Sequence, residues 1–453
     1  MDIIKIPEVL IPKRGIDPSK WAVVACDQFT SESAYWEDVE KLTRDAYSAY
    51  HISYPEIYLG CGGEEKNARI EKINANMKRY LDEDIFDTVS DGLVLVERTT
   101  KCACAPRFGL MIAADLEAYD FKPFNKAYIK ATEGTILERL PVRISIRKNA
   151  LLELPHILLL ADDAEKTVIE PLAGKRESFL KLYDFELNKG GGRLRGYKIP
   201  GAESKKAIEK LYALADKAVL ERKYGGAESN FLLAVGDGNH SLAAAKACWD
   251  VLKVSLSLEE RKNHPARYAL AELVNLYDCA LKFEPIHRVI FGAGADFMGG
   301  LKTAFKGSGG LRVIDGRMKY AEHTALTSAD SVSEENGGLR RVTDGRAEYG
   351  EYGEYAERTV PVSADPTEAI RDIQEYIEAY LKTHNEAAVD YIHGEKHLRE
   401  IVSARGSIGI LTPSIDKSEL FPYVISNGAL PKKAFSMGEA EEKRYYFEAK
   451  RIK

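Results

Sequence analysis

The chain has 453 residues, of which 45% are hydrophobic and 30% charged, and its formal net charge is −6. This composition excludes a chain that is disordered along most of its length, and the length predicts two or three packed units. The acidic balance argues against a dedicated nucleic-acid or membrane binder, because such proteins usually present a basic face.

Targeting and redox signals point to the cytoplasm. The N-terminal sequence lacks the apolar stretch of a signal peptide, and no run reaches the roughly 20 apolar residues of a membrane helix. Six cysteines in so long a chain do not make a disulfide framework, and Cys102 and Cys104 are two apart, not the three of a Cys-x-x-Cys pair. We therefore expect a cytoplasmic protein with reduced thiols and no membrane association.

Residues 1–125 predict an N-terminal α/β unit, because strand-like and helix-like patterns alternate along them. The expected elements are a strand at 21–26, a helix after Thr30-Ser31-Glu32-Ser33, a helix from Glu64 to Asp82, and paired strands at 92–97 and 108–113.

Residues 126–300 carry most of the chemically capable segments and are expected to form the catalytic core. A Gly-rich stretch at 190–193 predicts a turn, or a loop that closes over something. The apolar run at 231–235 predicts a buried strand, followed by a helix for which Ser241 is the expected cap. Further expected elements are β-like runs at 142–146 and 157–160 and one amphipathic helix from Ser204 to Tyr224.

Residues 301–453 form the expected C-terminal part, and residues 306–364 within it are rich in Gly, Ser, Glu and Tyr. Leu311–Tyr320 is nearly repeated by Leu339–Tyr349, and each copy has an Asp-Gly turn between strand-like residues, which predicts a small hairpin. We interpret 306–364 as a β-rich surface insertion, and a helix is expected from Pro366 to His384.

The segment from Gly236 to Ser241 concentrates several reactive groups at the expected end of a strand, where open α/β sheets bind ligands. A helix start presents unpaired backbone N–H groups and a positive dipole end, which suit phosphate, and Gly236 and Gly238 let the backbone approach a ligand closely. Asp237 can hold a divalent cation or orient a hydroxyl, and His240 can donate to a phosphoryl oxygen or move a proton.

The same spacing also fits a simpler interpretation. Asp237-Gly238-Asn239 can be an ordinary tight turn in which His240 is a hydrogen-bonded residue at the helix start. Asp-Gly turns are common, and this motif is less specific than a Walker-type phosphate loop.

Five segments, in sequence order, resemble the motifs of the domain-of-unknown-function family ten-fifteen (DUF 1015). Each segment alone is a weak signal, but together they cover most of the chain and are fairly specific. They are Lys130-Ala-Thr-Glu133-Gly-Thr135, Gly236-Asp-Gly-Asn-His-Ser-Leu-Ala-Ala-Ala-Lys246, Pro285-Ile-His287-Arg288, Tyr391-Ile-His393-Gly and Leu430-Pro431-Lys432-Lys433.

That family resembles, more remotely, the ParB/sulfiredoxin-like superfamily, some of whose members are kinases of free serine. The resemblance implies an α/β (α+β) fold with mixed sheets and a ParB/sulfiredoxin-like core. It also implies that Glu133 is the base, Asp237 the metal-associated carboxylate and His240 the phosphate contact.

Two positions depart from the family pattern. Asn239 stands where the family often has His, and Ser241 stands where it often has Arg. Losing that arginine puts the phosphate clamp in doubt unless another arginine replaces it. The expected phosphate- or nucleotide-binding residues are Gly236, Gly238, Asn239 and Ser241 of this segment, together with Lys130, Thr135, Arg139, Arg143, His287 and Arg288.

Other motifs are weaker. His393-Gly-Glu-Lys-His397 has a metal-ligand spacing on a helix, but its order differs from that of zinc proteases and Gly394 weakens the helix. The sequence has no Gly-x-Ser-x-Gly elbow and no Gly-x-Gly-x-x-Gly after a strand, which disfavours an α/β-hydrolase and a dinucleotide enzyme.

These observations predict phosphoryl transfer to a small hydroxylated metabolite, with free serine as the leading acceptor. The expected cofactors are Mg²⁺ and a nucleotide donor, ATP or ADP, and homo-oligomerisation is left open. Two alternatives remain, a non-catalytic nucleotide-binding or regulatory module of the ParB-like type, and a phosphohydrolase that uses water as the acceptor.

Overall fold

The computed structural model describes residues 3–30, 32–101, 103, 105–134, 140–225, 230–319, 340–343, 346–349, 355–438 and 442–453. These residues form two compact units. Unit 1 comprises residues 1–282, 417–429 and 437–453, and unit 2 comprises residues 283–416 and 430–436. The division of the chain into three segments, 1–125, 126–300 and 301–453, stays a prediction.

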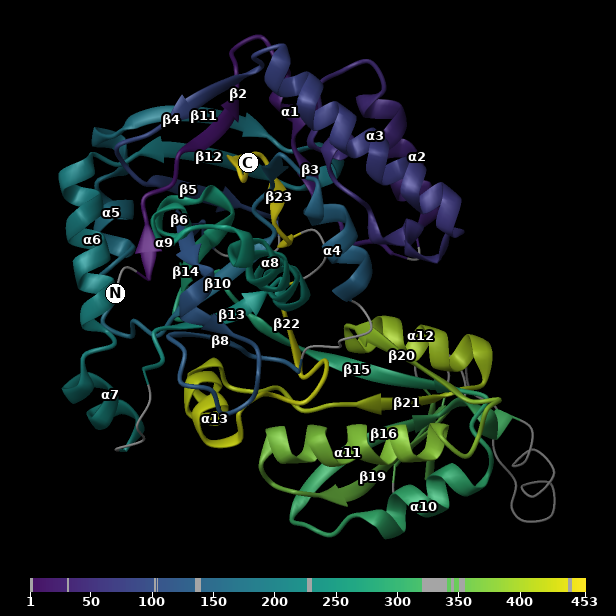
Figure 1. Ribbon diagram of the computed structural model, residues 1–453. Coiled ribbons are helices and arrows are strands. Elements are labelled where there is room, and N and C mark those ends of the chain that lie inside the picture. Colours follow the sequence, from purple (N-terminus) through teal and green to yellow (C-terminus); the bar gives the residue numbers. More distant parts are fainter. Residues whose placement is uncertain are drawn as a thin grey trace, which may run out of the picture. The chain divides into compact units, whose positions relative to one another are not determined.

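Unit 1 is built around a large mixed sheet (Figure 1). In the order in which they lie across the sheet, its strands are β11 (Leu180–Glu186), β12 (Arg193–Lys198), β5 (Val94–Thr99), β6 (Arg107–Asp115), β14 (Tyr268–Asn275), β10 (Ile157–Ala161), β13 (Leu233–Asp237), β8 (Ile129–Ala131) and β7 (Tyr119–Asp120). β13 is antiparallel to β10 and parallel to β8. Shorter pairings join β1 (Ile4–Lys5) to β6, β2 (Val9–Pro12) to β4 (Phe86–Val89), β3 (Val23–Val24) to β23 (Tyr445–Tyr446), and β9 (Leu152–Glu153) to β24 (Lys450–Arg451).

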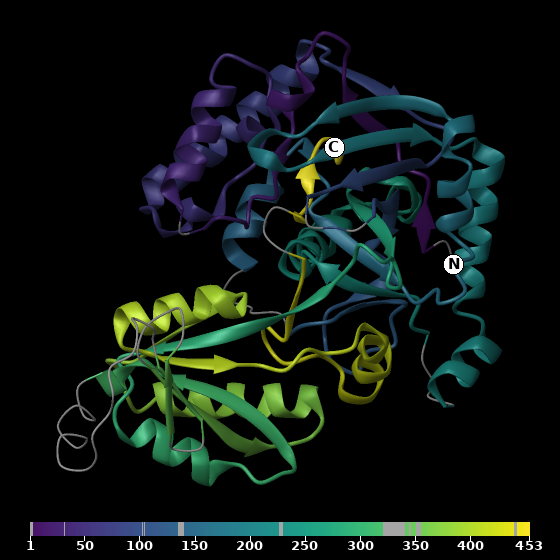
Figure 2. The same ribbon diagram turned by 180° about the vertical axis from the view of Figure 1, so that it is seen from behind.

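Helices cover both faces of this sheet because successive strand residues point to opposite sides. Along β6, Met111 belongs to the core on one face, whereas Leu110 and Ile112 belong to the core on the other. The first core includes residues of α2 and α3, and the second includes residues of α6 and α8; α2 and α3 lie on the opposite side of unit 1 from α6 in both views (Figures 1 and 2). The helices of unit 1 are α1 (Pro18–Trp21), α2 (Ser33–Thr43), α3 (Gly63–Asp82), α4 (Leu140–Lys148), α5 (Glu170–Gly174), α6 (Gly201–Ala213), α7 (Lys217–Tyr224), α8 (Asn239–Leu252), α9 (Leu258–Asn263) and α13 (Leu420–Asn427).

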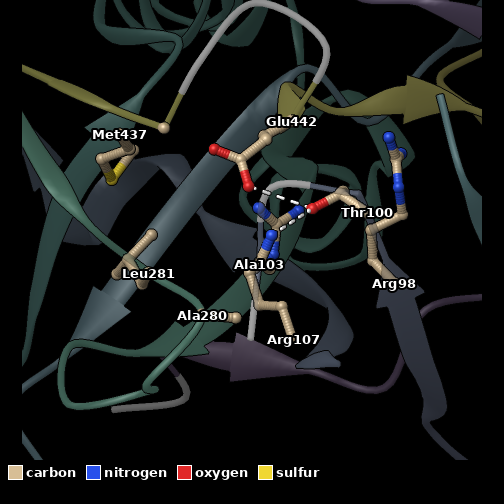
Figure 3. Close-up of a pocket in the computed structure, with 9 residues that line it drawn as sticks. Arg98, Thr100, Ala103, Arg107, Ala280, Leu281, Met437 and Glu442 are labelled. Atoms are coloured by element: carbon tan, nitrogen blue, oxygen red, sulfur yellow. Dashed lines mark hydrogen bonds between the residues drawn. The ribbon is translucent and has the colours of Figure 1, made fainter. Parts of the chain in front are cut away.

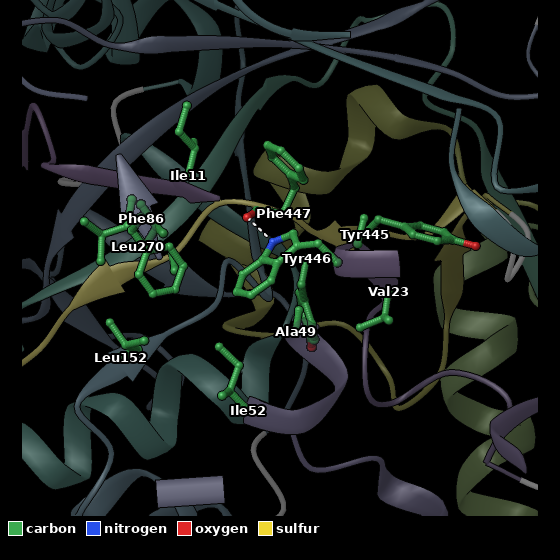
Figure 4. Close-up of a cluster of buried hydrophobic side chains, with 14 of the residues drawn as sticks. Ile11, Val23, Ala49, Ile52, Phe86, Leu152, Leu270, Tyr445, Tyr446 and Phe447 are labelled. Atoms are coloured by element: carbon green, nitrogen blue, oxygen red, sulfur yellow. Dashed lines mark hydrogen bonds between the residues drawn. The ribbon is translucent and has the colours of Figure 1, made fainter. Parts of the chain in front are cut away.

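The C-terminal tail is part of the core of unit 1. Tyr445, Tyr446 and Phe447 are each only 2% exposed and pack among side chains from the N-terminal region (Figure 4). The indole Nε1 of Trp21 donates to the carbonyl of Phe447 at 2.8 Å. Burying three aromatic rings fixes the path of the residues just before them, and this places Lys443 and Arg444.

Unit 2 is a second sheet with helices on both faces. Its strands lie in the order β18 (Arg346–Tyr349), β17 (Arg340–Thr343), β19 (Tyr355–Val362), β16 (Gly309–Asp315), β21 (Ile408–Leu411), β15 (Phe283–Phe291) and β20 (Ala388–His393). One face packs on α10 (Asp296–Ala304) and α11 (Pro366–Leu381), and the other packs on α12 (Glu395–Arg405). A short strand, β22 (Phe435–Met437), spans the point at which the chain passes from unit 2 back to unit 1.

The mixed α/β class expected from the sequence is confirmed, as are several of its elements. α2 begins at Ser33, α3 covers Gly63–Asp82, and α11 begins at Pro366. β5 and β6 are antiparallel neighbours, as the paired-strand pattern predicted. The Gly-rich stretch at 190–193 is the tight connection between β11 and β12.

Three local predictions are wrong. Residues 142–146 form part of α4 and not a strand, because Leu140 and Ile144, four residues apart, pack against Ala243 and Ala244 of α8. The single helix expected from Ser204 to Tyr224 is broken after Ala213 into α6 and α7. Ser241 does not cap α8, because the helix already begins at Asn239 and its N-cap is Gly238.

The segment 306–364 is β-rich, as expected, but its first and last strands, β16 and β19, lie inside the sheet and are not at the surface. β16 and β19 are antiparallel neighbours, and Val313 and Val360 are fully buried. The first Asp-Gly pair, Asp315-Gly316, ends β16 and does not form a hairpin turn, whereas β17 and β18 do pair as a hairpin. Residues 320–339 lie outside the described part of the chain.

Among the described residues, every helix is too short or too polar to cross a membrane. Cys26, Cys61, Cys248 and Cys279 are free thiols, and Cys102 and Cys104 lie outside the described residues.

Candidate functional site

The carboxyl end of β13 is a sharp turn that only glycine fits. Gly238 adopts a left-handed conformation, with φ 80° and ψ 25°, between Asp237 and the first residue of α8. A Cβ atom at Gly238 would lie 3.0 Å from both the ring and the carbonyl oxygen of His156. The backbone N–H of Gly238 donates to Oδ1 of Asp237 at 2.8 Å, which orients that carboxylate.

The start of α8 is tied to the end of the neighbouring strand β8. The backbone N–H of Thr132 donates to Oδ1 of Asn239 at 3.3 Å, and the Thr132 hydroxyl donates to the carbonyl of Val235 at 2.6 Å. Thr132 is fully buried and Asn239 nearly so. Asn239 therefore has a structural role that its position in a tight Asp-Gly-Asn turn did not reveal.

Glu133 and Asp237 leave two neighbouring strands at the same level. β8 and β13 run parallel with Ala131 opposite Val235, and each carboxylate lies two residues beyond these partners. Parallel strands in register present equivalent positions side by side. The register thus places side by side the ends of two strands whose following acidic residues are more than a hundred positions apart in the sequence.

A lysine from the C-terminal tail completes this strand end. Nζ of Lys443 lies 3.1 Å from Oδ2 of Asp237, and the lysine side chain is only 12% exposed. The buried aromatic residues that follow Lys443 hold it there. The ammonium group supplies positive charge beside the first turn of α8, which includes His240 and Ser241.

A second charged pair lies against the same turn. Nε2 of His156 is 3.5 Å from Oδ2 of Asp27, and Nδ1 of His156 is hydrogen-bonded to the hydroxyl of Tyr446. Burial opposes ionisation of the Asp27 carboxyl, but the His156 charge and hydrogen bond outweigh it and hold the pKa of Asp27 well below its usual range. Burial also disfavours the His156 cation, yet Tyr446 and Asp27 raise the pKa of His156 well above its usual value.

Arg143 lies near Asp27 and His156, but it forms an ion pair with a different residue. Its guanidinium forms a part-buried ion pair with Glu56 of the short helix Glu56–Gly60. Burial raises the pKa of Glu56, Arg143 opposes that shift, and the Asp27 charge adds to it. Arg143 is consequently engaged and does not face Asp237 as an unpaired cation.

The other expected phosphate-binding residues are placed elsewhere. The Lys130 ammonium is bonded to the Asn125 carbonyl and lies over the Phe231 ring. Within unit 2, the guanidinium of Arg288 is fully buried and donates to the carbonyls of Ile286 and Lys432.

His287, also in unit 2, is a neutral side chain. Its Nδ1 accepts from the backbone N–H of Thr412 at 3.3 Å, and burial lowers its pKa to about 4. Thr135 and Arg139 lie outside the described residues.

A family comparison covers most of this chain. The sequence profile of the family described as Protein of unknown function (DUF1015) matches residues 10–396. The chain belongs to the DUF1015 family. None of the curated proteins matches it.

Solved structures that resemble this DUF1015 member include a conserved hypothetical protein from Pyrococcus furiosus, with 11% identity over 72% of this chain and 90% of the other and a TM-score of 0.33. A mutant free serine kinase in complex with ADP has 11% identity, coverages of 76% and 92%, and a TM-score of 0.35. SbnI from Staphylococcus aureus, with a C-terminal truncation, has 11% identity, coverages of 72% and 81%, and a TM-score of 0.30. Because these values are low, the function of this DUF1015 member has to be inferred from its own residues.

Sequence patterns did not point to Asp27, His156 or Lys443. Asp27 follows a short apolar run, which was a weak signal. His156 precedes β10, and only the antiparallel pairing of β10 with β13, in which Leu158 lies opposite Asp237, brings it to this turn. Lys443 lies in a charged tail with no local motif.

The arrangement can bind an anion and can hold a carboxylate in a fixed position. Lys443 and the first turn of α8 supply positive charge, and the backbone N–H of Gly238 orients Asp237. Among the described residues, no three His, Cys, Asp or Glu side chains are grouped to hold a metal ion. A divalent cation in this DUF1015 member would thus need ligand oxygens in addition to Asp237.

Proposed function

We propose that this protein transfers a phosphoryl group from a nucleotide to a small hydroxylated metabolite, with a divalent cation present. One observation carries the proposal: Asp237, paired with Lys443 at 3.1 Å, ends β13 directly before α8, and Glu133 leaves the adjacent parallel strand at the same level. Phosphoryl transfer depends on positioning and charge neutralisation more than on covalent chemistry, and these groups supply both.

The terminal phosphates of the nucleotide bind at the first turn of α8. Backbone N–H groups at a helix start have no intrahelical acceptors, and Gly238 lets the chain approach the phosphate closely. His240 lies in that turn and donates to a phosphate oxygen. Lys443 supplies the cationic contact that Ser241 cannot provide.

Asp237 is the residue that would associate with Mg²⁺. Mg²⁺ is usually bound by one or two carboxylates together with phosphate oxygens and water, so a single aspartate beside a nucleotide can be enough to bind it. Mg²⁺ would neutralise charge on the phosphate oxygens. Lys443 then exchanges its contact with Asp237 for a contact with phosphate.

Glu133 is the base for the acceptor hydroxyl. Its strand end lies beside that of Asp237, so a hydroxyl held between them would face the phosphate bound at α8. The ParB/sulfiredoxin-like resemblance makes free serine the first acceptor to assay.

The test is a turnover assay on the full chain with Mg²⁺, ATP or ADP, and free serine, in which phosphoserine is measured. We expect phosphoserine from the wild type, and a loss of about 100-fold or more in Glu133→Gln and in Asp237→Asn with the fold retained. Glu259→Gln is the matched control, because Glu259 is 77% exposed on α9. Absence of wild-type turnover across donors and acceptors would overturn the proposal, and nucleotide binding without turnover would favour a regulatory module.

A further inference from the structure

The two residues on either side of Lys443 are both buried in unit 1. Glu442 is 9% exposed and Arg444 is 8% exposed, and the proposed phosphoryl transfer uses neither of them. The ammonium group of Lys443 pairs with Asp237 at the end of β13. Contacts that fix the two neighbours therefore also limit where this ammonium group can lie.

Glu442 is held by the residue that follows β5. Its Oε1 accepts a hydrogen bond from the hydroxyl of Thr100 at 3.0 Å (Figure 3). β5 ends at Thr99, so this bond joins the tail directly to a strand of the large sheet. A hydrogen bond to an ionised carboxylate is stronger than one between neutral groups, which makes it an effective link.

Arg444 is held from the middle of the same sheet. Its guanidinium forms an ion pair with Glu272 of β14, whose side chain is only 1% exposed. Burial opposes ionisation of Glu272, but the charges of Arg444 and Arg107 outweigh it and lower the pKa of Glu272. Arg107 stays 3.8 Å away, beyond hydrogen-bond distance, so Arg444 makes the direct contact with this carboxylate.

Further contacts hold Arg444 from other sides. Its Nη2 lies 2.5 Å from Oε2 of Glu448, and Tyr183 of β11 donates its hydroxyl to the other oxygen of Glu448. The backbone carbonyl of Arg444 accepts from the N–H of Ala25 at 2.8 Å. The forked guanidinium thus bridges two carboxylates, which the single ammonium group of a lysine reproduces poorly.

Two glycines show that the sheet is shaped around this network. A Cβ atom at Gly109 of β6 would collide with the side chain of Glu272, and one at Gly196 of β12 would collide with the ring of Tyr183. Glycine inside a strand often marks such a close approach. The strands therefore leave room for the groups that hold Arg444.

We propose that Glu442 and Arg444 are positioning residues for Lys443. Anchored to Thr100 and Glu272, they keep the ammonium group at the end of β13, where it is available to a phosphate. The inference rests on the proposed function, because it extends the role given there to Lys443. The aromatic rings of the tail hold the chain that follows, whereas these polar contacts hold the two residues directly next to the lysine.

The first test needs no nucleotide. It measures by peptide mass spectrometry how fast an acetylating reagent labels Lys443 in the full chain, where this side chain is 12% exposed. Thr100→Val should speed the labelling by about fivefold, the equivalent of one lost hydrogen bond, and Arg444→Lys by at least as much. Thr100→Ser keeps the hydroxyl and should behave like the wild type. Wild-type labelling rates in both Thr100→Val and Arg444→Lys would overturn the proposal.

Arg267→Lys is the control for a general loss of stability. Arg267 forms a comparable two-bond contact with the buried Asp115, at 2.9 and 2.6 Å, beside the beginning of β14. Losing this fork should lower the unfolding free energy but leave the labelling of Lys443 at its wild-type rate. Equally fast labelling in Arg267→Lys and Arg444→Lys would contradict a positioning role.

A double-mutant cycle then tests the link to the phosphate site. Arg444→Lys should weaken the affinity for a Mg²⁺–nucleotide complex by about fivefold, and should have no effect in a Lys443→Met background, because it acts only through Lys443. Equal weakening in both backgrounds would contradict the proposal. A wild type that binds no nucleotide would instead count against the proposed function, and the labelling rates would still decide whether Glu442 and Arg444 place Lys443.

Discussion

Nζ of Lys443 lies 3.1 Å from Oδ2 of Asp237, although 206 positions separate the two residues in the sequence. The contact makes the C-terminal tail part of the strand-end site. In the proposed phosphoryl transfer, Lys443 takes the part of the arginine that the family often has at position 241, where this chain has serine. Lys443 neutralises Asp237 in the free protein, and the proposal has its flexible side chain turn to phosphate in the complex.

Replacing Lys443 should weaken nucleotide binding without unfolding the protein. Lys443→Met removes a cation from the phosphate site and leaves Asp237 without its partner, so we expect affinity for a Mg²⁺–nucleotide complex to fall by about tenfold. Lys443→Arg should retain part of the affinity. Isothermal titration calorimetry measures this, with Lys78→Met on the exposed face of α3 as the control. An unchanged dissociation constant in Lys443→Met would exclude the phosphate role.

Gly238 should tolerate substitution less well than another left-handed glycine. Gly238→Ala combines a positive φ with a contact of 3.0 Å to His156, so the unfolding free energy should fall by about 2–4 kcal/mol. Gly225→Ala is the matched control, because Gly225 has φ 72° and no atom of the described residues lies within 4 Å of an added Cβ, and about 1 kcal/mol is expected. Urea unfolding gives both values. Equal losses would show that the His156 contact does not constrain the turn.

The bond between Asn239 and Thr132 should couple stability to activity. Asn239→Ala leaves the buried N–H of Thr132 without its acceptor, which costs about 1–3 kcal/mol of unfolding free energy. It also removes a bond that fixes the position of Glu133, the residue after Thr132. Asn239→Asp keeps an acceptor and should lose less. Thermal unfolding together with the phosphoserine assay checks the pair of effects. A destabilised variant with full turnover would separate Asn239 from the positioning of Glu133.

The Asp27–His156 pair predicts a pH dependence of stability. The pKa of His156 is raised on folding, so its stabilising effect is complete below the ordinary value of 6.5 and is lost as pH rises toward the folded-state pKa. The pKa of Asp27 is lowered, so its contribution is present above 3.8 and is lost in acid. Between about pH 4 and 6.5 both contributions act.

His156→Gln should therefore be most destabilising near about pH 6, and its deficit should shrink above pH 6.5 by up to about 1.4 kcal/mol per unit. Denaturant unfolding of wild type and variant at about pH 6 and 8.5 measures this difference. A deficit that grows with pH would mean that His156 is neutral in the folded protein.

Elements with strong periodicity were predictable, and the site was predictable only in part. α3 was evident because Ile70, Ile73 and Met77 repeat at helical spacing and form its buried face. The strand–Asp-Gly–helix unit was also found, because its glycines and apolar run are local signals.

Long-range packing decided the rest. Residues 142–146 have β-branched side chains at alternate positions, yet Ala243 and Ala244 offer a flat surface on α8 against which a helix packs. His156 and Lys443 reach Asp237 only through an antiparallel strand pairing and a buried tail. No spacing within the sequence encodes either contact, so these residues could not be assigned to the site beforehand.

The most direct test is a crystal structure of the full chain with Mg²⁺ and a nucleotide. We predict that the terminal phosphate lies at the first turn of α8 within hydrogen-bond reach of Lys443, with Asp237 facing the metal and Glu133 facing the space for an acceptor hydroxyl. Nucleotide bound elsewhere, with Lys443 still paired to Asp237, would contradict the account.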